Sequence, residues 1–301
     1  MVSLVPLATF RRLALEGNYT RTAEALSLTQ PAVTQHVRAL EAHFGVKLVD
    51  IVGRRAVLTD AGRFLAARAE AVLGAVSALE RDMLEYADAR SGTLRLGATL
   101  TIGTYDLPAL AGAFRALHPG VTLEVAIENT ARIVELVRAG ELALALVEGT
   151  VDADEELTVT PYAEDDLVVI VAPGHPAAGR GSVDAETFRD EPFVAREEGS
   201  GTRVAFERAF RLAGIEPRVA LALPSGEGIV RAVEARLGAA VLSRRVVADA
   251  LAAGRVVRVP VTGLELHRAF NLVRPHRITP SPAAQAFTAL VINERGAEAE
   301  A

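Results

Sequence analysis

The feature that most constrains this chain is a two-faced helix near its N-terminus. Thr29 is a typical N-cap, Pro31 is tolerated in a first helical turn, and Gly45 ends the segment. Between them, apolar residues recur at helical spacing and form one stripe, made of Val33, Val37, Leu40 and Phe44. Small polar and basic side chains occupy the opposite face. The segment therefore predicts a helix that packs on one side and leaves the other side open to a partner.

The neighbouring segments give this helix a context. Apolar residues recur at helical spacing over residues 4–14, and Thr20 is a candidate N-cap for a second, short helix. After the third helix, two short apolar runs flank Gly53-Arg54-Arg55. This pattern predicts a hairpin with a basic tip, so residues 1–58 are expected to form an all-α head with a wing.

Composition limits the classes of protein to consider. A chain of 301 residues suggests about two domains, and it has no cysteine, which excludes disulfides, thiolate zinc sites and cysteine nucleophiles. No metal or cofactor motif is present, and no apolar run is long enough to cross a bilayer, so we expect a cytoplasmic protein without a membrane partner. The net charge is −6, yet residues 1–58 contain seven basic and four acidic residues, which suits a head that approaches phosphate.

Polar groups near the start of a helix can enter the major groove, where Gln and Arg offer paired hydrogen bonds to purine edges. The run "GNYTRTAEALSLTQPAVTQHVRALEAHFGVKL", followed by "GRRAVLTDAG", resembles the DNA-binding region of LysR-type transcription regulators. One departure is Val49-Asp50-Ile51, where that family has an aromatic residue followed by Glu-Arg. The resemblance implies double-stranded promoter DNA as the partner. It places these residues on DNA: Thr29, Gln30, Pro31, Thr34, Gln35, Arg38, Arg54 and Arg55.

A long helix is predicted next, over residues 59–90, beginning at the N-cap Thr59 and ending before Ser91-Gly92. Its apolar residues repeat every seven positions, which is typical of a two-stranded coiled coil, although a helix packed on its own domain is the alternative. We expect a homodimer through Leu65, Val72, Val76, Leu79 and Met83. The family resemblance extends this expectation to a homotetramer.

Residues 93–296 alternate strand-like and helical runs, which indicates parallel sheets covered by helices and an α/β class for the chain overall. The resemblance implies two lobes similar to periplasmic binding proteins. We place the two crossings between lobes near 163–167 and 266–270. Lobe I then comprises 93–165 and 270–296, and lobe II comprises 166–269.

Hydroxyl- and glycine-rich turns follow three predicted strands, at Thr99–Gly103, Glu197–Arg203 and Pro224–Gly228. Ligands in open α/β sheets lie beyond such strand ends, and free amides there favour an anion. In sulfur-related LysR regulators, a Thr-x-Thr and a Ser/Thr loop hold a small oxyanion, and this chain matches both. The resemblance assigns the effector to Thr99, Thr101, Asn129, Glu148, Gly149, Ser200, Gly201 and Thr202.

Glu148 complicates an anion site, because a carboxylate repels an anion unless it is protonated or paired; Arg203 or Arg196 could offset it. The sequence thus predicts a non-enzymatic regulator whose promoter binding responds to a small oxyanion or organic acid. A small-molecule receptor without DNA readout is one alternative. An α/β enzyme is another, with Ser200 or Ser243 beside a histidine, but no Gly-x-Ser-x-Gly elbow is present. The sequence leaves open the effector, the operator and the direction of regulation.

Overall fold

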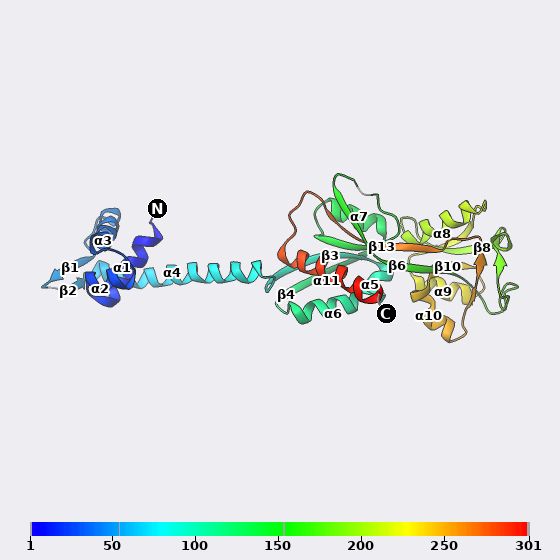
Figure 1. Cartoon of the computed structure of the whole chain (residues 1–301), viewed down its shortest axis with the longest axis horizontal. Coiled ribbons are helices and arrows are strands. Elements are labelled where there is room, and N and C mark those ends of the chain that lie inside the picture. The colour runs from blue at the N-terminus through cyan, green and yellow to red at the C-terminus, as the bar shows by residue number, and fades with distance from the viewer. Residues whose placement is uncertain (1, 54, 153, 300–301) are drawn as a thin grey trace. The chain divides into compact units, whose positions relative to one another are not determined.

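The computed structural model describes residues 2–53, 55–152 and 154–299, with side chains as far as residue 293. The chain divides into two compact units, Met1–Glu85 and Tyr86–Ala301 (Figure 1). Within the described part, none of the helices is both long enough and apolar enough to cross a bilayer.

The first unit is a helical head with a two-stranded hairpin. Its elements are α1 (Leu4–Glu16), α2 (Tyr19–Ala25), α3 (Gln30–Phe44), β1 (Val49–Val52), β2 (Arg55–Leu58) and most of α4 (Asp60–Ala87). The apolar stripe predicted for α3 is buried at Val33, Val37 and Leu40, where it packs with Phe10 and Leu13 of α1. These contacts position α3 with its polar face outward.

Helix capping in this unit follows the sequence at two positions and departs from it at one. The Thr29 hydroxyl accepts a hydrogen bond from the Ala32 amide, and the Thr59 hydroxyl accepts one from Gly62. The prediction that Thr20 caps the second helix is wrong. Asn18 is the cap, because its side-chain oxygen accepts from the amides of Thr20 and Arg21, and α2 therefore begins at Tyr19, two residues earlier than a Thr20 cap implies.

The second unit has two lobes, here called lobe I and lobe II, each a sheet with helices on its faces (Figure 1). Lobe I contains β3 (Gly92–Thr99), α5 (Leu100–Tyr105), α6 (Leu107–Leu117), β4 (Val121–Glu128), α7 (Thr130–Arg138), β5 (Leu144–Glu148) and α11 (Pro282–Ala299). Lobe II contains β7 (Val183–Asp184), η1 (Ala185–Phe188), β8 (Pro192–Arg196), α8 (Gly201–Leu212), β9 (Arg218–Leu223), α9 (Gly226–Glu234), β10 (Ala240–Ser243), α10 (Arg244–Ala252), β11 (Val257–Val259) and β12 (Val261–Thr262).

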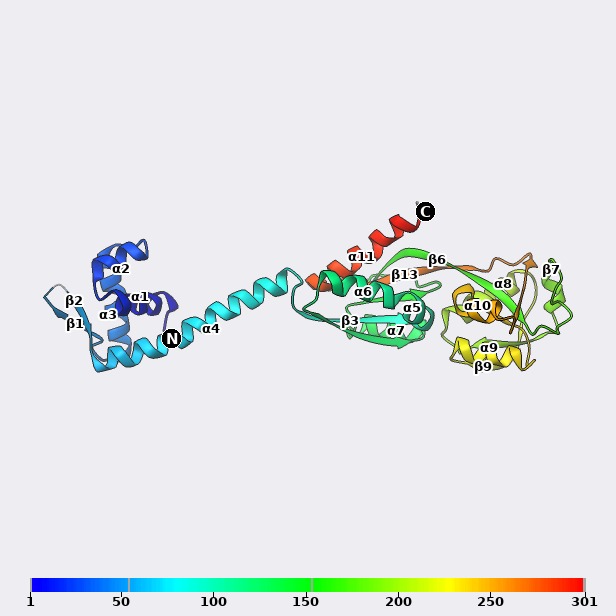
Figure 2. The ribbon, with the colours of Figure 1, turned by 90° about the horizontal axis from the view of Figure 1, so that it is seen from below.

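Two long strands connect the lobes, β6 (Leu157–Val171) and β13 (His267–Pro275), and they run side by side in Figure 2. They pair antiparallel from Leu157↔Pro275 to Asp166↔His267. Beyond that point β6 pairs with β10 and β11 instead, so a single strand serves both sheets. The crossing predicted near 163–167 thus lies within β6, and the one predicted near 266–270 coincides with the start of β13.

These connecting strands correct one expectation. The sheets are not purely parallel: β3 pairs parallel with β4 and β5, whereas β13 and β6 are antiparallel to their neighbours. The reason is topological. The chain leaves lobe I along β6 and returns along the adjacent β13, so the two strands must run in opposite directions.

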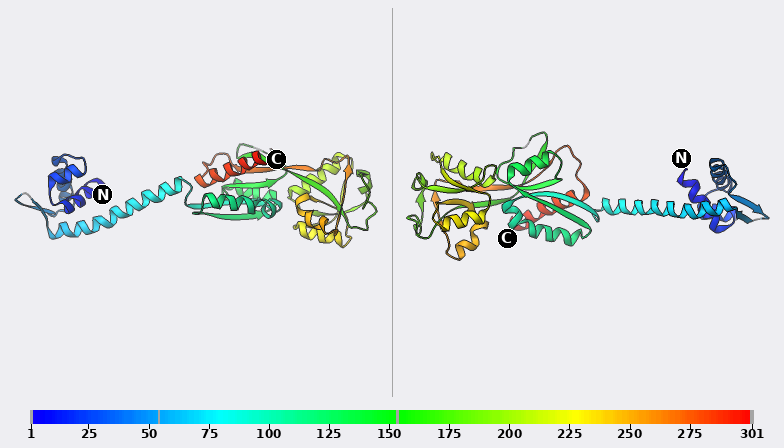
Figure 3. Two further views of the ribbon diagram at one scale, coloured as in Figure 1. Left: turned by 60° about the horizontal axis from the view of Figure 1, so that its bottom comes forward. Right: turned by 180° about the vertical axis from the view of Figure 1, so that it is seen from behind.

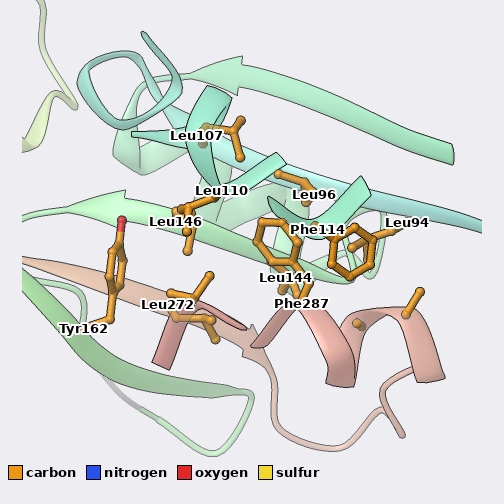
Figure 4. Close-up of a cluster of buried hydrophobic side chains, with 14 of the residues drawn as sticks. Leu94, Leu96, Leu107, Leu110, Phe114, Leu144, Leu146, Tyr162, Leu272 and Phe287 are labelled. Atoms are coloured by element: carbon orange, nitrogen blue, oxygen red, sulfur yellow. The ribbon is translucent and has the colours of Figure 1, made fainter. Parts of the chain in front are cut away.

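Each lobe buries apolar side chains on both faces of its sheet. In lobe I, Phe114 of α6 lies against Phe287 of α11 over the leucines of β3 and β5 (Figure 4), and α7 covers the other face through Ile133 and Val137. Figure 3 shows from two further sides that α11 lies with lobe I. In lobe II, α8 covers one face of the sheet and α9 with α10 the other.

Candidate functional sites

The exposed face of α3 is the first candidate site. A concave surface of about 550 Å³ is lined by five residues that the sequence assigned to DNA, namely Gln30, Pro31, Thr34, Gln35 and Arg38. Within the described residues, the side chains of Gln30, Gln35 and Arg38 form no hydrogen bond or ion pair. These donors and acceptors are therefore open to a partner, and they are held in place because the opposite side of α3 is buried.

The remaining polar groups of α3 hold the helix itself. Thr29 is exposed but its hydroxyl caps the first turn, and the Thr34 hydroxyl donates to the Gln30 carbonyl at 3.0 Å. His36 lies on the flank, where its Nδ1 is 2.9 Å from the Thr9 hydroxyl. The contact surface thus consists mainly of the two glutamines and Arg38.

The hairpin of β1 and β2, the predicted wing, has a basic side chain exposed on the surface of the first unit. Arg55 begins β2, opposite Val52 of β1, and is exposed; Arg54, the other arginine predicted to contact phosphate, lies outside the described residues. Lys47 just before β1 forms an ion pair of 2.7 Å with Asp50, and the hydrogen bond to Asp50 raises the Lys47 pKa. Asp50, the acidic departure from the family pattern, thus neutralises a neighbouring cation.

The apolar residues predicted for dimerisation differ in burial along α4. Leu65 packs against the core of the head. By contrast, Val72, Leu79 and Met83 are exposed, with Val76 half-buried between them. Within its own unit the helix therefore leaves part of its seven-residue repeat uncovered.

At the junction of the two lobes, the carboxylate of Glu148 sits among three predicted effector residues. Glu148 ends β5 and is only 2% exposed. Its Oε1 accepts a hydrogen bond of 3.0 Å from the Thr101 amide, and its Oε2 accepts one of 3.4 Å from the Thr202 hydroxyl. Thr99, the N-cap residue of α5, is buried beside them at the end of β3. We call Thr99, Thr101 and Thr202 the threonine cradle.

Arg268 on β13 compensates the charge of Glu148. Its guanidinium donates to Oε2 of Glu148 at 2.6 Å and to the Thr202 hydroxyl at 2.7 Å. Burial alone raises the pKa of Glu148, but the attraction of Arg268 and the hydrogen bonding of Thr101 outweigh it, so that pKa is lowered overall. Glu148 is therefore ionised at neutral pH.

The polar network extends into lobe II through Asp165 of β6. Arg268 also donates to Asp165 at 2.9 Å, and Asp165 accepts a hydrogen bond of 2.7 Å from the Ser243 hydroxyl at the end of β10. Nearby, Arg245 of α10 forms an ion pair of 2.5 Å with Asp106, which precedes α6. Both lobes are thus tied together by buried charged groups at their crossing.

The other predicted effector residues support the junction with their backbones. A Cβ added to Gly201 would lie 2.3 Å from the Glu148 carbonyl oxygen, so only glycine allows α8 to approach β5 this closely. The carbonyl of Gly149 accepts a hydrogen bond from Asn271, and Asn129 caps α7 while donating to the Glu198 carbonyl at 3.4 Å. Ser200 is buried at the start of α8.

A small cavity of about 120 Å³ opens beside the cradle, between the lobes. Thr101 and Thr202 line one side of it, and Arg196 and Ser225 of lobe II contribute further polar groups. Gly149 and Gly201 instead line a larger, open concavity of about 500 Å³, which also includes Arg268 and Asn271. The residues that the sequence assigned to one effector site therefore have different places. Thr99, Thr101 and Thr202 surround Glu148, and two of these threonines also line the small cavity. The other assigned residues hold the surrounding backbone together.

Two of the central residues were not predicted. Arg268 and Asp165 lie inside the predicted crossings, and each occupies the buried side of a strand's alternation, Asp165 in register with Leu167 and Arg268 with Phe270. A charged residue at a position that must be buried was the signal that could have found them. The arginines considered beforehand play smaller parts, since Arg196 pairs with Glu197 and Arg203 pairs with Glu207.

The serines and histidines considered for catalysis have other contacts. Ser243 donates to Asp165 and caps the amide of Arg245, so no hydrogen bond of its side chain within the described residues involves a histidine. His175 lies beside Glu191, and His276 contacts Thr158. In the part of the chain that the structure describes, no three His, Cys, Asp or Glu residues are arranged to hold a metal ion.

Comparison with known proteins assigns both units. The family model described as "LysR substrate binding domain" matches residues 87–295, and "Bacterial regulatory helix-turn-helix protein, lysR family" matches residues 4–63. The RuBisCO operon transcriptional regulator of Allochromatium vinosum is 33% identical over 293 residues, which cover 97% of this chain and 96% of that protein.

Solved structures extend the comparison. The regulatory domain of CcmR from Synechocystis PCC6803, in complex with 2-PG, is 27% identical with a TM-score of 0.63, covering 68% of this chain and 98% of that one. A full-length OxyR variant from Pseudomonas aeruginosa has a TM-score of 0.77 at 22% identity, covering 97% and 100% of the two chains, and it shares the fold.

Proposed function

The chain belongs to the LysR family of transcription regulators, with a helix-turn-helix and an effector-binding domain, and we propose that a small acid bound between its lobes controls how α3 engages promoter DNA. The observation that carries the DNA half is the exposed face of α3, where the predicted residues line one surface with uncommitted side chains. Gln30, Gln35 and Arg38 would contact base edges, with Thr29, Pro31 and Thr34 beside them. Arg54 and Arg55 would contact phosphates.

The domain boundaries suggested by the sequence remain part of this proposal. Residues 1–58 would bind DNA, residues 59–90 would pair two chains, and residues 93–296 would bind the effector. The exposed residues of α4, Val72, Leu79 and Met83, support pairing, because apolar side chains at seven-residue spacing are buried when two such helices associate. Two heads would then read two half-sites of a promoter, as a dimer or within a tetramer.

The effector would be a compact acid. The cavity between the lobes measures about 120 Å³ and is lined by Arg196 and Ser225 beside the threonine cradle. Glu197 engages the Arg196 guanidinium through Nε and Nη2, which leaves Nη1, and this nitrogen and the Ser225 hydroxyl can donate hydrogen bonds to an oxyanion. The similarity to a regulatory domain solved in complex with 2-PG supports a small-molecule ligand for this domain. Binding would favour one arrangement of the lobes, since a ligand shifts an equilibrium by its differential affinity for the two states.

The DNA half is tested by selecting an operator from random duplexes with the full chain and measuring its affinity by fluorescence anisotropy. The triple variant Gln30→Ala, Gln35→Ala and Arg38→Ala should bind that operator at least about 30-fold more weakly, the result of losing about two base contacts of 1–3 kcal/mol each. Arg132→Ala, an exposed arginine of α7, is the control. Undiminished binding by the triple variant would refute the role of α3.

The effector half is tested by calorimetry with compact phosphorylated and carboxylic acids. A saturable signal that Ser225→Ala weakens would support the cavity. If only uncharged compounds bind, the acid proposal fails while the DNA proposal stands.

A further inference from the structure

The threonine cradle already holds an anion, and that anion belongs to the chain. The Thr101 amide donates to one oxygen of Glu148, and the Thr202 hydroxyl donates to the other. These are the groups that the sequence offered to an oxyanion of the effector. Because they are bonded to Glu148, they are not free for a second acid.

The charges around the cradle also oppose a second anion. The Arg268 guanidinium is shared between two buried carboxylates, at 2.6 Å from Glu148 and 2.7 Å from Asp165. Arg268, Glu148 and Asp165 are each no more than 4% exposed, so water screens their interactions little. An external anion that entered beside Glu148 would meet two carboxylates and a guanidinium already neutralised.

The three groups come from different parts of the fold. Glu148 ends a strand of lobe I, Thr202 starts a helix of lobe II, and Arg268 lies on the connecting strand between them. The contacts of Thr202 and Arg268 with Glu148 therefore also fix the distance between the lobes. A carboxylate at the start of α8 is further favoured by the positive end of the helix dipole.

We propose that Glu148 is a built-in occupant of the threonine cradle, which closes the cradle to external oxyanions and confines an acidic effector to the adjoining cavity lined by Arg196 and Ser225. The inference deepens the proposed effector site and rests on it for the location of the effector. The closure itself needs only the contacts of Glu148. The Glu148 carboxylate then has two roles: it determines where the ligand can bind, and it joins the two lobes.

The proposal is tested by removing the internal carboxylate and supplying an external one. Glu148→Ala should leave the cradle without its anion and Arg268 with one of its two carboxylate partners, Asp165, and formate should occupy the vacated position. Sodium formate, compared with sodium chloride at equal ionic strength, should raise the melting temperature of this variant saturably, with an apparent Kd at least about tenfold lower than for the unaltered chain. Inorganic sulfate serves as a second, larger probe.

Glu128→Ala is the matched control, because Glu128 is an exposed glutamate at the end of β4, another strand of the lobe I sheet. If formate stabilises Glu148→Ala no more than this control, the proposal is overturned. If Glu148→Ala is unfolded in chloride, recovery of its folding in formate supports the proposal and failure to recover overturns it.

The unaltered chain provides an independent test. It should show no saturable binding of formate or sulfate that Thr202→Val abolishes, and the presence of such binding would overturn the proposal. No DNA and no native effector enters these measurements. A failure of the proposed function would therefore leave them interpretable, and their failure would leave the DNA result untouched.

Discussion

The exposed face of α3 and the cradle around Glu148 contain similar chemical groups in opposite states. On α3, amide and guanidinium groups project from one helix and form no bonds within the described residues. In the cradle, a carboxylate, a guanidinium and hydroxyls come from distant segments and bond to one another. Polar residues are available to a partner where their donors and acceptors form no hydrogen bonds within the chain. Buried polar groups usually form such bonds with one another.

The largest effect should follow from breaking the cradle. Arg268→Ala leaves Glu148 and Asp165 buried without their shared cation, which should lower the free energy of unfolding by about 3–5 kcal/mol. Urea denaturation of the full chain measures this loss. In contrast, Gln35→Ala on α3 should leave the denaturation midpoint unchanged, because its side chain has no hydrogen bond to lose within the described residues. Equal losses of unfolding free energy for the two variants would contradict the difference between bonded groups in the cradle and unbonded groups on α3.

A smaller effect should follow from crowding the same junction. Gly201→Ala places a methyl group 2.3 Å from the Glu148 carbonyl oxygen and 3.0 Å from the Thr130 hydroxyl, so α8 or β5 must shift. We expect a loss of about 1–3 kcal/mol in unfolding free energy. Gly112→Ala in α6 is the matched control, because nothing lies within 4 Å of the added Cβ, and it should stabilise the chain by up to about 1 kcal/mol. A neutral Gly201→Ala would contradict the close approach.

The smallest effect concerns the wing, where the exposed Lys47 forms an ion pair with Asp50. Asp50→Ala frees Lys47 from its ion pair, so the lysine becomes available to a phosphate. The slope of log K for DNA against log salt should steepen by about 0.9, the value for one added phosphate contact. Asp88→Ala, which releases the exposed Arg90 in the second unit, is the control. An unchanged slope would separate Lys47 from the DNA surface.

The same contrast explains how much the sequence could predict. The buried and exposed faces of α3 follow from its periodicity, since a helix fixes which residues share a side. The crossings near 163–167 and 266–270 follow from the two-lobed organisation that the family resemblance implies. The antiparallel pairing of β6 with β13 could not be derived from local pattern, because it depends on which strands become neighbours in the folded chain.

The cradle was predicted only in part for a related reason. Thr101, Glu148 and Thr202 were all singled out, and the structure brings them together. Their pairing with Arg268 was not foreseen, because that residue is 120 positions from Glu148 and no local rule connects the two. Sequence reasoning identified residues suited to an anion without showing that the anion was a side chain.

The central claim is that α3 reads base pairs through its open side chains, and base-specific affinity tests it most directly. Each position of the selected operator is substituted in turn, and binding is measured for the unaltered chain, Gln35→Ala and Arg55→Ala. We expect Gln35→Ala to lose discrimination of about 1–3 kcal/mol at one position per half-site, whereas Arg55→Ala should weaken the binding of all operators alike. Identical discrimination profiles for Gln35→Ala and the unaltered chain, repeated with Gln30→Ala and Arg38→Ala, would contradict it.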